Sequence, residues 1–171
     1  MTLLELMEKA LKIKKREMVE MFEDGMQAVR MTYYPPCPQP ERAVGFSPHS
    51  DATGITILLQ VNQVEGLQLK KDGTWIPLQP LQDSFAVNVG DILENISNGV
   101  YKSVGHKVTV NSEKERISIP TFFNPKFEVE FGPATTILNP QTPPLFKRAK
   151  SRKLDGKSLL EILKINRNPT K

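Results

Sequence analysis

The 171-residue sequence contains only two histidines, and each lies where a metal-binding site could use it. His49 stands two positions before Asp51, and His106 lies far downstream. Side chains two residues apart in an extended strand point to the same side, so His49 and Asp51 can reach one ion together. Two imidazoles and one carboxylate, with coordination positions left open, form the ligand set of non-haem Fe(II) oxygenases. We therefore interpret His49, Asp51 and His106 as candidate iron ligands.

A candidate anion-binding residue, Arg116, follows ten positions after His106. Strand alternation places Arg116, Ser118 and Phe122 on one face. Hairpin geometry is expected to bring their strand beside the strand that carries His106. Arginine suits a carboxylate because its planar fork binds both oxygens and keeps its charge when partly buried. The pattern predicts a docking point for an anionic co-substrate beside the metal.

Other interpretations stay open on these residues alone. A His-x-Asp triplet is also common in ordinary turns, and an Arg-x-Ser pair by itself carries little information. The same three ligands could serve a zinc hydrolase. The order of the candidates favours iron, because paired ligands come first, the third ligand comes late, and an anion-binding arginine lies on the next strand.

The elements expected to position these residues are a helix followed by many short strands. Apolar residues recur at helical spacing through residues 2–22, which predicts a helix that packs on a sheet. After Pro35 short apolar segments alternate with turn residues, which is typical of an all-β sandwich or barrel. The predicted strands cover residues 56–60, 67–69, 74–78, 84–89, 107–110, 116–119 and 127–131. We expect a hairpin turn at Lys71-Asp72-Gly73, a brief helical or irregular stretch from Asp91, and a closing helix over 157–165.

Composition limits the other possibilities. The length and 39% hydrophobic content suit one globular domain. Cys37 is the only cysteine, so an intrachain disulfide is excluded and a reducing compartment is expected. The basic cluster at residues 147–153 has no interleaved aromatic residues and no nucleic-acid-binding motif, which favours a solvated segment. No stretch of about 18 apolar residues occurs and no signal-peptide core is visible, so we expect a cytoplasmic protein that binds neither membranes nor nucleic acid.

Several motifs together resemble the plant-type Fe(II)- and 2-oxoglutarate-dependent dioxygenases, the isopenicillin N synthase-like family. The likeness runs from about Leu3 to Asn124 and resumes around residues 151–165. Its most specific pieces are Met31-Thr32-Tyr33-Tyr34-Pro35-Pro36-Cys37-Pro38, Ser47-Pro48-His49-Ser50-Asp51, Val87-Asn88-Val89-Gly90-Asp91, Ser97-Asn98-Gly99 and Glu115-Arg116-Ile117-Ser118. Family members that act on flavonoids, alkaloids and hormones look most similar.

The resemblance implies a fold, a cofactor set and a reaction. The fold is mainly β with flanking helices, a double-stranded β-helix or jelly roll. His49, Asp51 and His106 would bind Fe(II), Arg116 and Ser118 would hold the distal carboxylate of 2-oxoglutarate, and Tyr34 would hydrogen-bond this co-substrate. O2 is consumed, succinate and CO2 are released, and ascorbate serves as an optional reductant. The expected outcome is hydroxylation, desaturation or demethylation of a small organic plant metabolite.

The sequence also departs from the family pattern. Family members are about twice as long, so we expect the N-terminal helical region to be missing and the sheet to expose an apolar face and a free edge. A C-terminal helical segment is shortened to Ala149 and Lys150. Thr32 replaces an asparagine, Gly105 loosens the strand before the second histidine, and Pro120 removes a ladder donor from a strand.

These observations predict three regions: residues 1–25 as an N-terminal helix remnant packed on the sheet, 26–135 as the dioxygenase jelly roll, and 136–171 as a C-terminal extension with a short helix. The chain is expected to be a monomeric oxidoreductase that binds a small molecule. The alternative is a truncated, non-catalytic paralogue that retains the metal ligands and acts as an interaction module.

Overall fold

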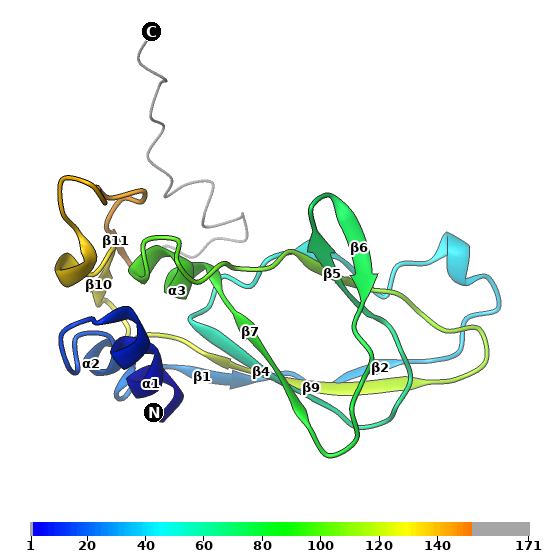
Figure 1. Ribbon diagram of the computed structural model, residues 1–171. Coiled ribbons are helices and arrows are strands. Elements are labelled where there is room, and N and C mark those ends of the chain that lie inside the picture. The colour runs from blue at the N-terminus through cyan, green and yellow to red at the C-terminus, as the bar shows by residue number, and fades with distance from the viewer. Residues whose placement is uncertain (1, 152–171) are drawn as a thin grey trace, which may run out of the picture.

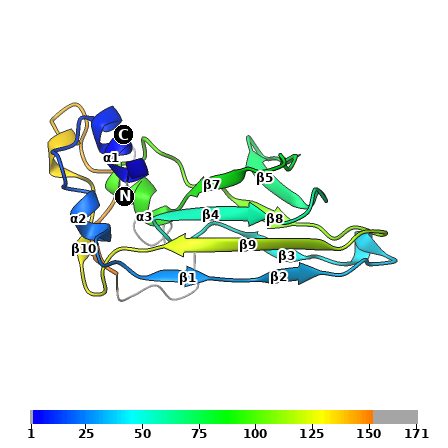
Figure 2. The same cartoon turned by 90° about the horizontal axis from the view of Figure 1, so that it is seen from below.

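The computed structural model describes residues 2–151, and two facing β-sheets form its larger part. The major sheet has five strands in the order β1-β9-β4-β7, with β2 also paired to β9. All its pairings are antiparallel. Its strands are β1 (Gln27–Val29), β2 (Thr32–Tyr34), β4 (Ile55–Gln60), β7 (Phe85–Val89) and β9 (Arg116–Phe123). Figure 2 shows β9 running between β4 and the β1–β2 pair.

The minor sheet has four strands in the order β3-β8-β5-β6. These strands are β3 (Phe46–His49), β5 (Leu67–Lys71), β6 (Thr74–Pro77) and β8 (His106–Val108). The predicted turn joins β5 to β6, and Asp72 and Gly73 have φ values of 49° and 81°. Two positive φ angles in succession define the turn type that fits the twist of a two-residue hairpin. The small cluster of Leu58, Leu67 and Val108 packs between the two sheets.

The N-terminal region contains two short helices, α1 (Thr2–Leu11) and α2 (Val19–Phe22), so the prediction of one helix over residues 2–22 is wrong. Lys12 has a φ of 56°, and Ile13 N–H donates to Glu8 O, which ends α1 in a left-handed cap. The Glu8 carboxylate is buried and accepts hydrogen bonds from the backbone N–H groups of Arg16, Met18 and Val19. A helical register continued past Leu11 would not present those N–H groups to Glu8.

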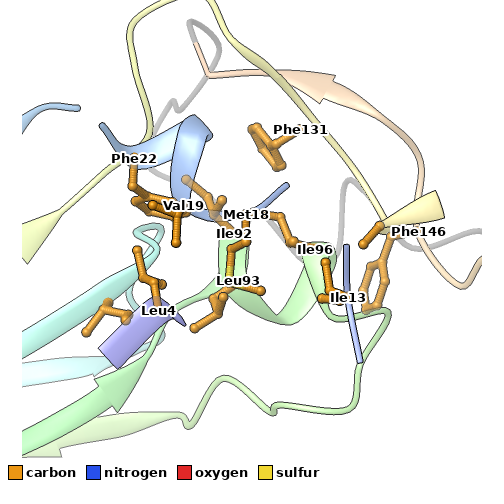
Figure 3. Close-up of a cluster of buried hydrophobic side chains, with 12 residues drawn as sticks. Leu4, Ile13, Met18, Val19, Phe22, Ile92, Leu93, Ile96, Phe131 and Phe146 are labelled. Carbon is orange, nitrogen blue, oxygen red and sulfur yellow. The ribbon is translucent and has the colours of Figure 1, made fainter. Parts of the chain in front are cut away.

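Both helices gather at one end of the sheets with α3 (Asp91–Ile96), β10 (Glu130–Phe131) and β11 (Ala149–Lys150) (Figure 1). Two 3₁₀ turns, Pro40–Arg42 and Thr135–Ile137, complete the elements. The main hydrophobic cluster lies at this end, where side chains of α1, α2 and α3 meet Phe131 and Phe146 (Figure 3). Ile92, Leu93 and Ile96 are fully buried, so α3 is the centre of this cluster. None of the helices within residues 2–151 is long and apolar enough to cross a membrane.

Two further predictions differ from the structure or fall outside it. The expected strand over 127–131 shrinks to β10, because Glu128 adopts a φ of 68° and turns the chain before Glu130. The expected helix over 157–165 lies outside the described residues. The prediction of an exposed apolar sheet face agrees with Val29, Phe85 and Val87, which are 64%, 64% and 50% exposed.

Candidate metal centre and co-substrate pocket

The structure brings the three predicted metal ligands together. His49 and His106 are directly opposite in the antiparallel pairing of β3 with β8, and their ring centroids lie 4.2 Å apart. Asp51 Oδ1 lies 3.7 Å from His49 Nε2 and 3.6 Å from His106 Nε2. One ligand atom from each of the three residues lies within 4.8 Å of the other two. These three atoms can therefore contact one ion.

Each ligand side chain is oriented by a hydrogen bond at the nitrogen or oxygen that does not face the other two ligands. His49 Nδ1 lies 2.8 Å from Ser47 O, and His106 Nδ1 lies 3.0 Å from Val104 O. A carbonyl can only accept, so each Nδ1 carries the proton and each Nε2 keeps its lone pair for a metal. Asp51 Oδ2 accepts a hydrogen bond of 2.7 Å from Thr56 Oγ1, which leaves Oδ1 to face the imidazoles.

The first residue of helix α3 forms hydrogen bonds with both segments that carry the metal ligands. Asp91, the first residue of α3, accepts hydrogen bonds from Ser50 Oγ at 3.2 Å and Ser103 Oγ at 2.7 Å. Ser50 lies between His49 and Asp51, and Ser103 stands three residues before His106. The Asp91 N–H also donates to the Asp51 carbonyl oxygen at 2.8 Å. The fully buried Asp91 therefore fixes the distance between the first two ligands and the third.

The protonation of His49 also suits metal binding. Burial lowers the pKa of His49 below its ordinary value, and the nearby charges of His106 and Arg30 lower it further. The Ser47 carbonyl and Asp51 oppose this effect. A lowered pKa keeps the imidazole neutral to lower pH, which is the form that donates a lone pair to a metal.

The predicted anion-binding residue, Arg116, is 2% exposed and faces the same cavity. Its two terminal nitrogens donate to Ser118 Oγ at 3.0 Å and Gln60 Oε1 at 2.9 Å, while its buried Nε has no hydrogen-bond partner. Burial lowers the pKa of Arg116 from its ordinary value, and Tyr34 opposes this effect. Within residues 2–151 no acidic side chain forms an ion pair with Arg116. A buried cation with an unpartnered N–H and no acidic partner among the described residues is suited to an anionic ligand.

The hydroxyl groups of Ser118 and Thr32 form a small hydrogen-bond network beside Arg116. Thr32 Oγ1 donates to Ser118 O at 2.9 Å and lies 2.8 Å from Ser118 Oγ. Ser118 therefore accepts from Arg116 and can donate to Thr32, so the threonine that replaces the family's asparagine is satisfied. The Tyr34 ring centroid lies 5.5 Å from Arg116 Cζ, and Tyr34 lines the cavity.

The predicted hairpin between the strands of His106 and Arg116 is wrong. β8 pairs with β3 and β5 in the minor sheet, whereas β9 pairs with β1, β2 and β4 in the major sheet. Both edges of each strand are occupied, so the two strands cannot pair with one another. The segment from Thr109 to Glu115 crosses between the sheets, and Arg116 faces the histidines across the cavity. Sequence alternation did place Arg116, Ser118 and Phe122 on one face, and all three line the cavity.

Thr56, Gln60 and Asp91 position the site residues and were not predicted to do so. Gln60 shares a row with Ser118 across the β4–β9 pairing and binds the Arg116 guanidinium. Asp91 was visible only as part of a matching motif, and its contacts with Ser50 and Ser103 join residues distant in sequence. Gly105, expected to loosen its strand, is held by a hydrogen bond of 2.7 Å from Lys70 N–H to its carbonyl oxygen.

The donor set fits Fe(II) with 2-oxoglutarate. Two neutral imidazole nitrogens and one carboxylate oxygen leave other coordination positions open. Arg116, which lines the same cavity and has no acidic partner among the described residues, could anchor the second carboxylate of a dicarboxylate. His49, Asp51 and His106 would hold the metal, and Arg116 with Ser118 would hold the far carboxylate.

Comparisons with known proteins agree with this geometry. The sequence profile of the 2OG-Fe(II) oxygenase superfamily matches residues 23–125. Codeine O-demethylase from Papaver somniferum is 52% identical over 171 residues, which cover 94% of this chain and 48% of that protein. Oxoglutarate-dependent flavonoid 7-O-demethylase 1 from Ocimum basilicum is 52% identical over 168 residues, which cover 93% and 45%. A crystal structure of JOX2 in complex with 2OG, Fe and JA has a TM-score of 0.82 and 43% identity, with 86% of this chain and 44% of that chain covered.

The chain belongs to the 2OG-Fe(II) oxygenase superfamily. The structural match confirms the mainly β, jelly-roll fold, and the family is one whose cofactors are Fe(II) and 2-oxoglutarate. The chain spans about half the length of the curated relatives that it matches.

Proposed function

We propose that this chain carries the metal and co-substrate site of a plant Fe(II)- and 2-oxoglutarate-dependent oxygenase that removes an O-methyl group from a small organic metabolite. The observation that supports this most strongly is the combination of three convergent ligand atoms with a buried Arg116 whose Nε lacks a partner. The two demethylases that are each 52% identical support demethylation over hydroxylation or desaturation. Residues 26–135 are the proposed catalytic unit.

The proposed reaction balances as follows. Methyl ether, O2 and 2-oxoglutarate give alcohol, formaldehyde, succinate and CO2. When bound, Fe(II) would activate O2, and of the four electrons that reduce O2 two come from the oxidative decarboxylation of 2-oxoglutarate and two from the methyl group of the substrate. Oxidation of the methyl carbon gives a hemiacetal, which breaks its carbon–oxygen bond to release formaldehyde.

The chain's own residues would supply positioning and a constant charge environment. His49 and His106 present fixed lone pairs because their Nδ1 protons are held by backbone carbonyls. Asp51 would supply one negative charge that partly balances the charge of the metal ion, and the hydrogen bond from Thr56 keeps that carboxylate oriented. Arg116 and Ser118 would fix the far carboxylate, with Tyr34 beside them. Pro120 and Phe122 form an apolar wall of the cavity for the organic substrate.

This set of residues favours an oxygenase over the alternative of a non-catalytic paralogue, because the ligands and the anion anchor are all retained. We extend the proposal to a cytoplasmic monomer that does not bind nucleic acid or membranes. The single cysteine supports the location. Phe146, the aromatic residue next to the basic segment, is 3% exposed and cannot stack on a base, which supports the absence of nucleic-acid binding.

The test begins without O2. Fe(II) and 2-oxoglutarate should produce the weak visible charge-transfer band of the chelate in the wild-type chain and not in His49→Ala. Admission of O2 should then release succinate, and a methoxylated flavone or alkaloid should add formaldehyde in equal amount. A folded wild-type chain with neither the band nor succinate would refute the proposal, and succinate without formaldehyde would refute demethylation alone.

A further inference from the structure

Thr32 and Ser118 present two hydroxyl groups to one another beside Arg116. The two residues are directly opposite in the pairing of β2 with β9, and both line the cavity. One contact of 2.9 Å joins Thr32 Oγ1 to the Ser118 carbonyl oxygen, and a second of 2.8 Å joins the two hydroxyl oxygens. Ser118 Oγ also lies 3.0 Å from a terminal nitrogen of Arg116. The two contacts between Thr32 and Ser118 depend on two hydroxyl protons.

The direction of both protons follows from what each partner can do. A carbonyl oxygen only accepts, so the Thr32 proton points to the Ser118 carbonyl oxygen. A guanidinium only donates, so Ser118 Oγ accepts from Arg116. The contact between the two hydroxyls is then made by the Ser118 proton, which points to Thr32 Oγ1. In the ligand-free chain the Ser118 hydroxyl therefore has no proton left for a ligand of Arg116.

The protons of Gln60, on the other side of Ser118, are committed in the same way. Gln60 is opposite Ser118 in the pairing of β4 with β9. Its amide nitrogen donates to the carbonyl oxygens of Asn62 and Val64 at 2.8 and 2.7 Å, and its amide oxygen accepts from Arg116. Neither amide proton is left for a ligand. A carboxylate at Arg116 can therefore gain a neutral donor from this row only if the Ser118 proton leaves its present acceptor.

We infer that Thr32 weakens the binding of 2-oxoglutarate by competing with its far carboxylate for the Ser118 proton. Thr32 is a positioning residue that acts through Ser118. Binding exchanges the hydrogen bond between Ser118 and Thr32 for one between Ser118 and the carboxylate, so the lost bond cancels part of the gain. This inference rests on the proposed function, because it places the far carboxylate of 2-oxoglutarate at Arg116 and Ser118.

The test begins with Thr32→Val, which removes the hydroxyl and keeps the size and branching of the side chain. 2-Oxoglutarate is titrated calorimetrically into the chain, both metal-free and with Fe(II) under anaerobic conditions. The variant should bind 2-oxoglutarate about fivefold more tightly than the wild type, because one neutral hydrogen bond no longer breaks on binding. Thr32→Ala should show the same gain with a side chain that also lacks the hydroxyl. Thr32→Ser keeps the competing hydroxyl and should bind as the wild type does.

Two controls separate competition for the proton from a change in the shape of the cavity. In a Ser118→Ala background no proton is shared, so adding Thr32→Val should leave 2-oxoglutarate affinity unchanged. The probe 2-oxopentanoate has the same keto acid end but lacks the far carboxylate, so the Fe(II)-loaded wild type and Thr32→Val should bind it equally. Unchanged or weaker binding of 2-oxoglutarate in folded Thr32→Val would overturn the inference. A gain that persists without Ser118, or that extends to 2-oxopentanoate, would overturn it as well.

The charge-transfer band separates this inference from the proposed function. A normal band with no gain in Thr32→Val refutes this inference alone. A missing band, together with a gain in the metal-free chain that depends on Ser118, refutes the proposed oxygenase and leaves the competition for the proton.

Discussion

The two sheets build their halves of the site in different ways. The minor sheet and its loops supply His49, Asp51 and His106, and each of these side chains has a hydrogen-bond partner behind it. The major sheet supplies Arg116, which is buried with one nitrogen unpartnered and no acidic partner among residues 2–151. The three metal ligands are therefore oriented by hydrogen bonds within the protein, whereas the charge of Arg116 has no acidic partner among the described residues.

This difference separates two sources of affinity. Preorganised ligands lose little conformational freedom when an ion binds, so the geometry behind the ligands sets metal affinity. A buried cation without a counter-charge destabilises the free protein, so an arriving carboxylate both binds and relieves that cost. Changes in the metal half should therefore reduce metal binding, and changes in the anion half should alter the coupling between co-substrate and stability.

The largest effect is expected from Asp51→Asn. The change keeps the shape and the hydrogen bond from Thr56 but removes the only negative charge among the three ligands. Fe(II) affinity should fall by more than about 100-fold, beyond what loss of an outer contact causes, and succinate formation should fall to background. Anaerobic metal titration measures the first effect, and far-ultraviolet circular dichroism confirms that the variant is folded. An affinity within tenfold of wild type would show that Asp51 is not a ligand.

Arg116→Met should have the next largest effect, and it should affect 2-oxoglutarate binding without affecting Fe(II) binding. The charge-assisted contact between the guanidinium and the far carboxylate disappears, so 2-oxoglutarate affinity should fall by about 100-fold. At 100 times its dissociation constant, 2-oxoglutarate stabilises the wild type by about 2.7 kcal/mol, and this gain should vanish in the variant. Without 2-oxoglutarate the variant should be at least as stable as wild type, because a buried unpaired charge is gone. Thermal unfolding with and without 2-oxoglutarate measures both.

A marked loss of stability in ligand-free Arg116→Met would contradict this division of the site into a metal half and an anion half. It would mean that the contacts with Ser118 and Gln60 already stabilise the cation. Arg42→Met serves as the control for the loss of one surface charge, and neither its stability nor its response to 2-oxoglutarate should change.

A smaller effect is expected from Asp91→Asn. The side chain accepts hydrogen bonds from Ser50 and Ser103, and an amide can accept at only one of its two positions. At the other position the amide can only donate to the serine hydroxyl, in a weaker hydrogen bond without a charged partner, so the two ligand-bearing segments are held less firmly and Fe(II) affinity should fall by about 10- to 100-fold. Binding of 2-oxoglutarate to the metal-free chain should stay unchanged, since Arg116 lies in the other sheet. A parallel loss of both affinities would point to general unfolding instead.

Much of the fold could be predicted because its elements are local. The hairpin at Asp72-Gly73 follows from two residues that tolerate positive φ, and strand alternation correctly grouped Arg116, Ser118 and Phe122. The helix over residues 2–22 was wrong because its break depends on the buried Glu8, a charged residue among apolar ones. Periodicity treats such a residue as a surface position, whereas its carboxylate binds three backbone N–H groups.

The candidate site was predictable in its residues but not in its architecture. The chain has only two histidines, and an aspartate follows one of them by two positions, so these residues could be identified by type and spacing. The placement of β8 and β9 in different sheets could not be predicted, because the segment between them is compatible with either a hairpin or a crossover. Whether a hairpin or a crossover forms depends on the pairing of β8 with β3 and β5 and of β9 with β2 and β4, which are all distant in sequence. Gln60 and Asp91 were missed for the same reason.

The smallest effect is expected from the pH dependence of the metal-free chain. Burial, aided by the charges of His106 and Arg30, lowers the pKa of His49, so the folded chain binds fewer protons there than the unfolded chain does. His49 therefore has no effect on stability well above its unfolded pKa of about 6.5, and it destabilises the fold increasingly as pH falls from there toward the folded pKa. His49→Gln removes this dependence. Urea unfolding at a series of pH values from about 7 to about 5 should show a shallower loss of stability in the variant than in wild type. Parallel curves would mean that the neutral form of His49 is not favoured by the fold, and that metal binding alone, rather than the protein, keeps this ligand deprotonated.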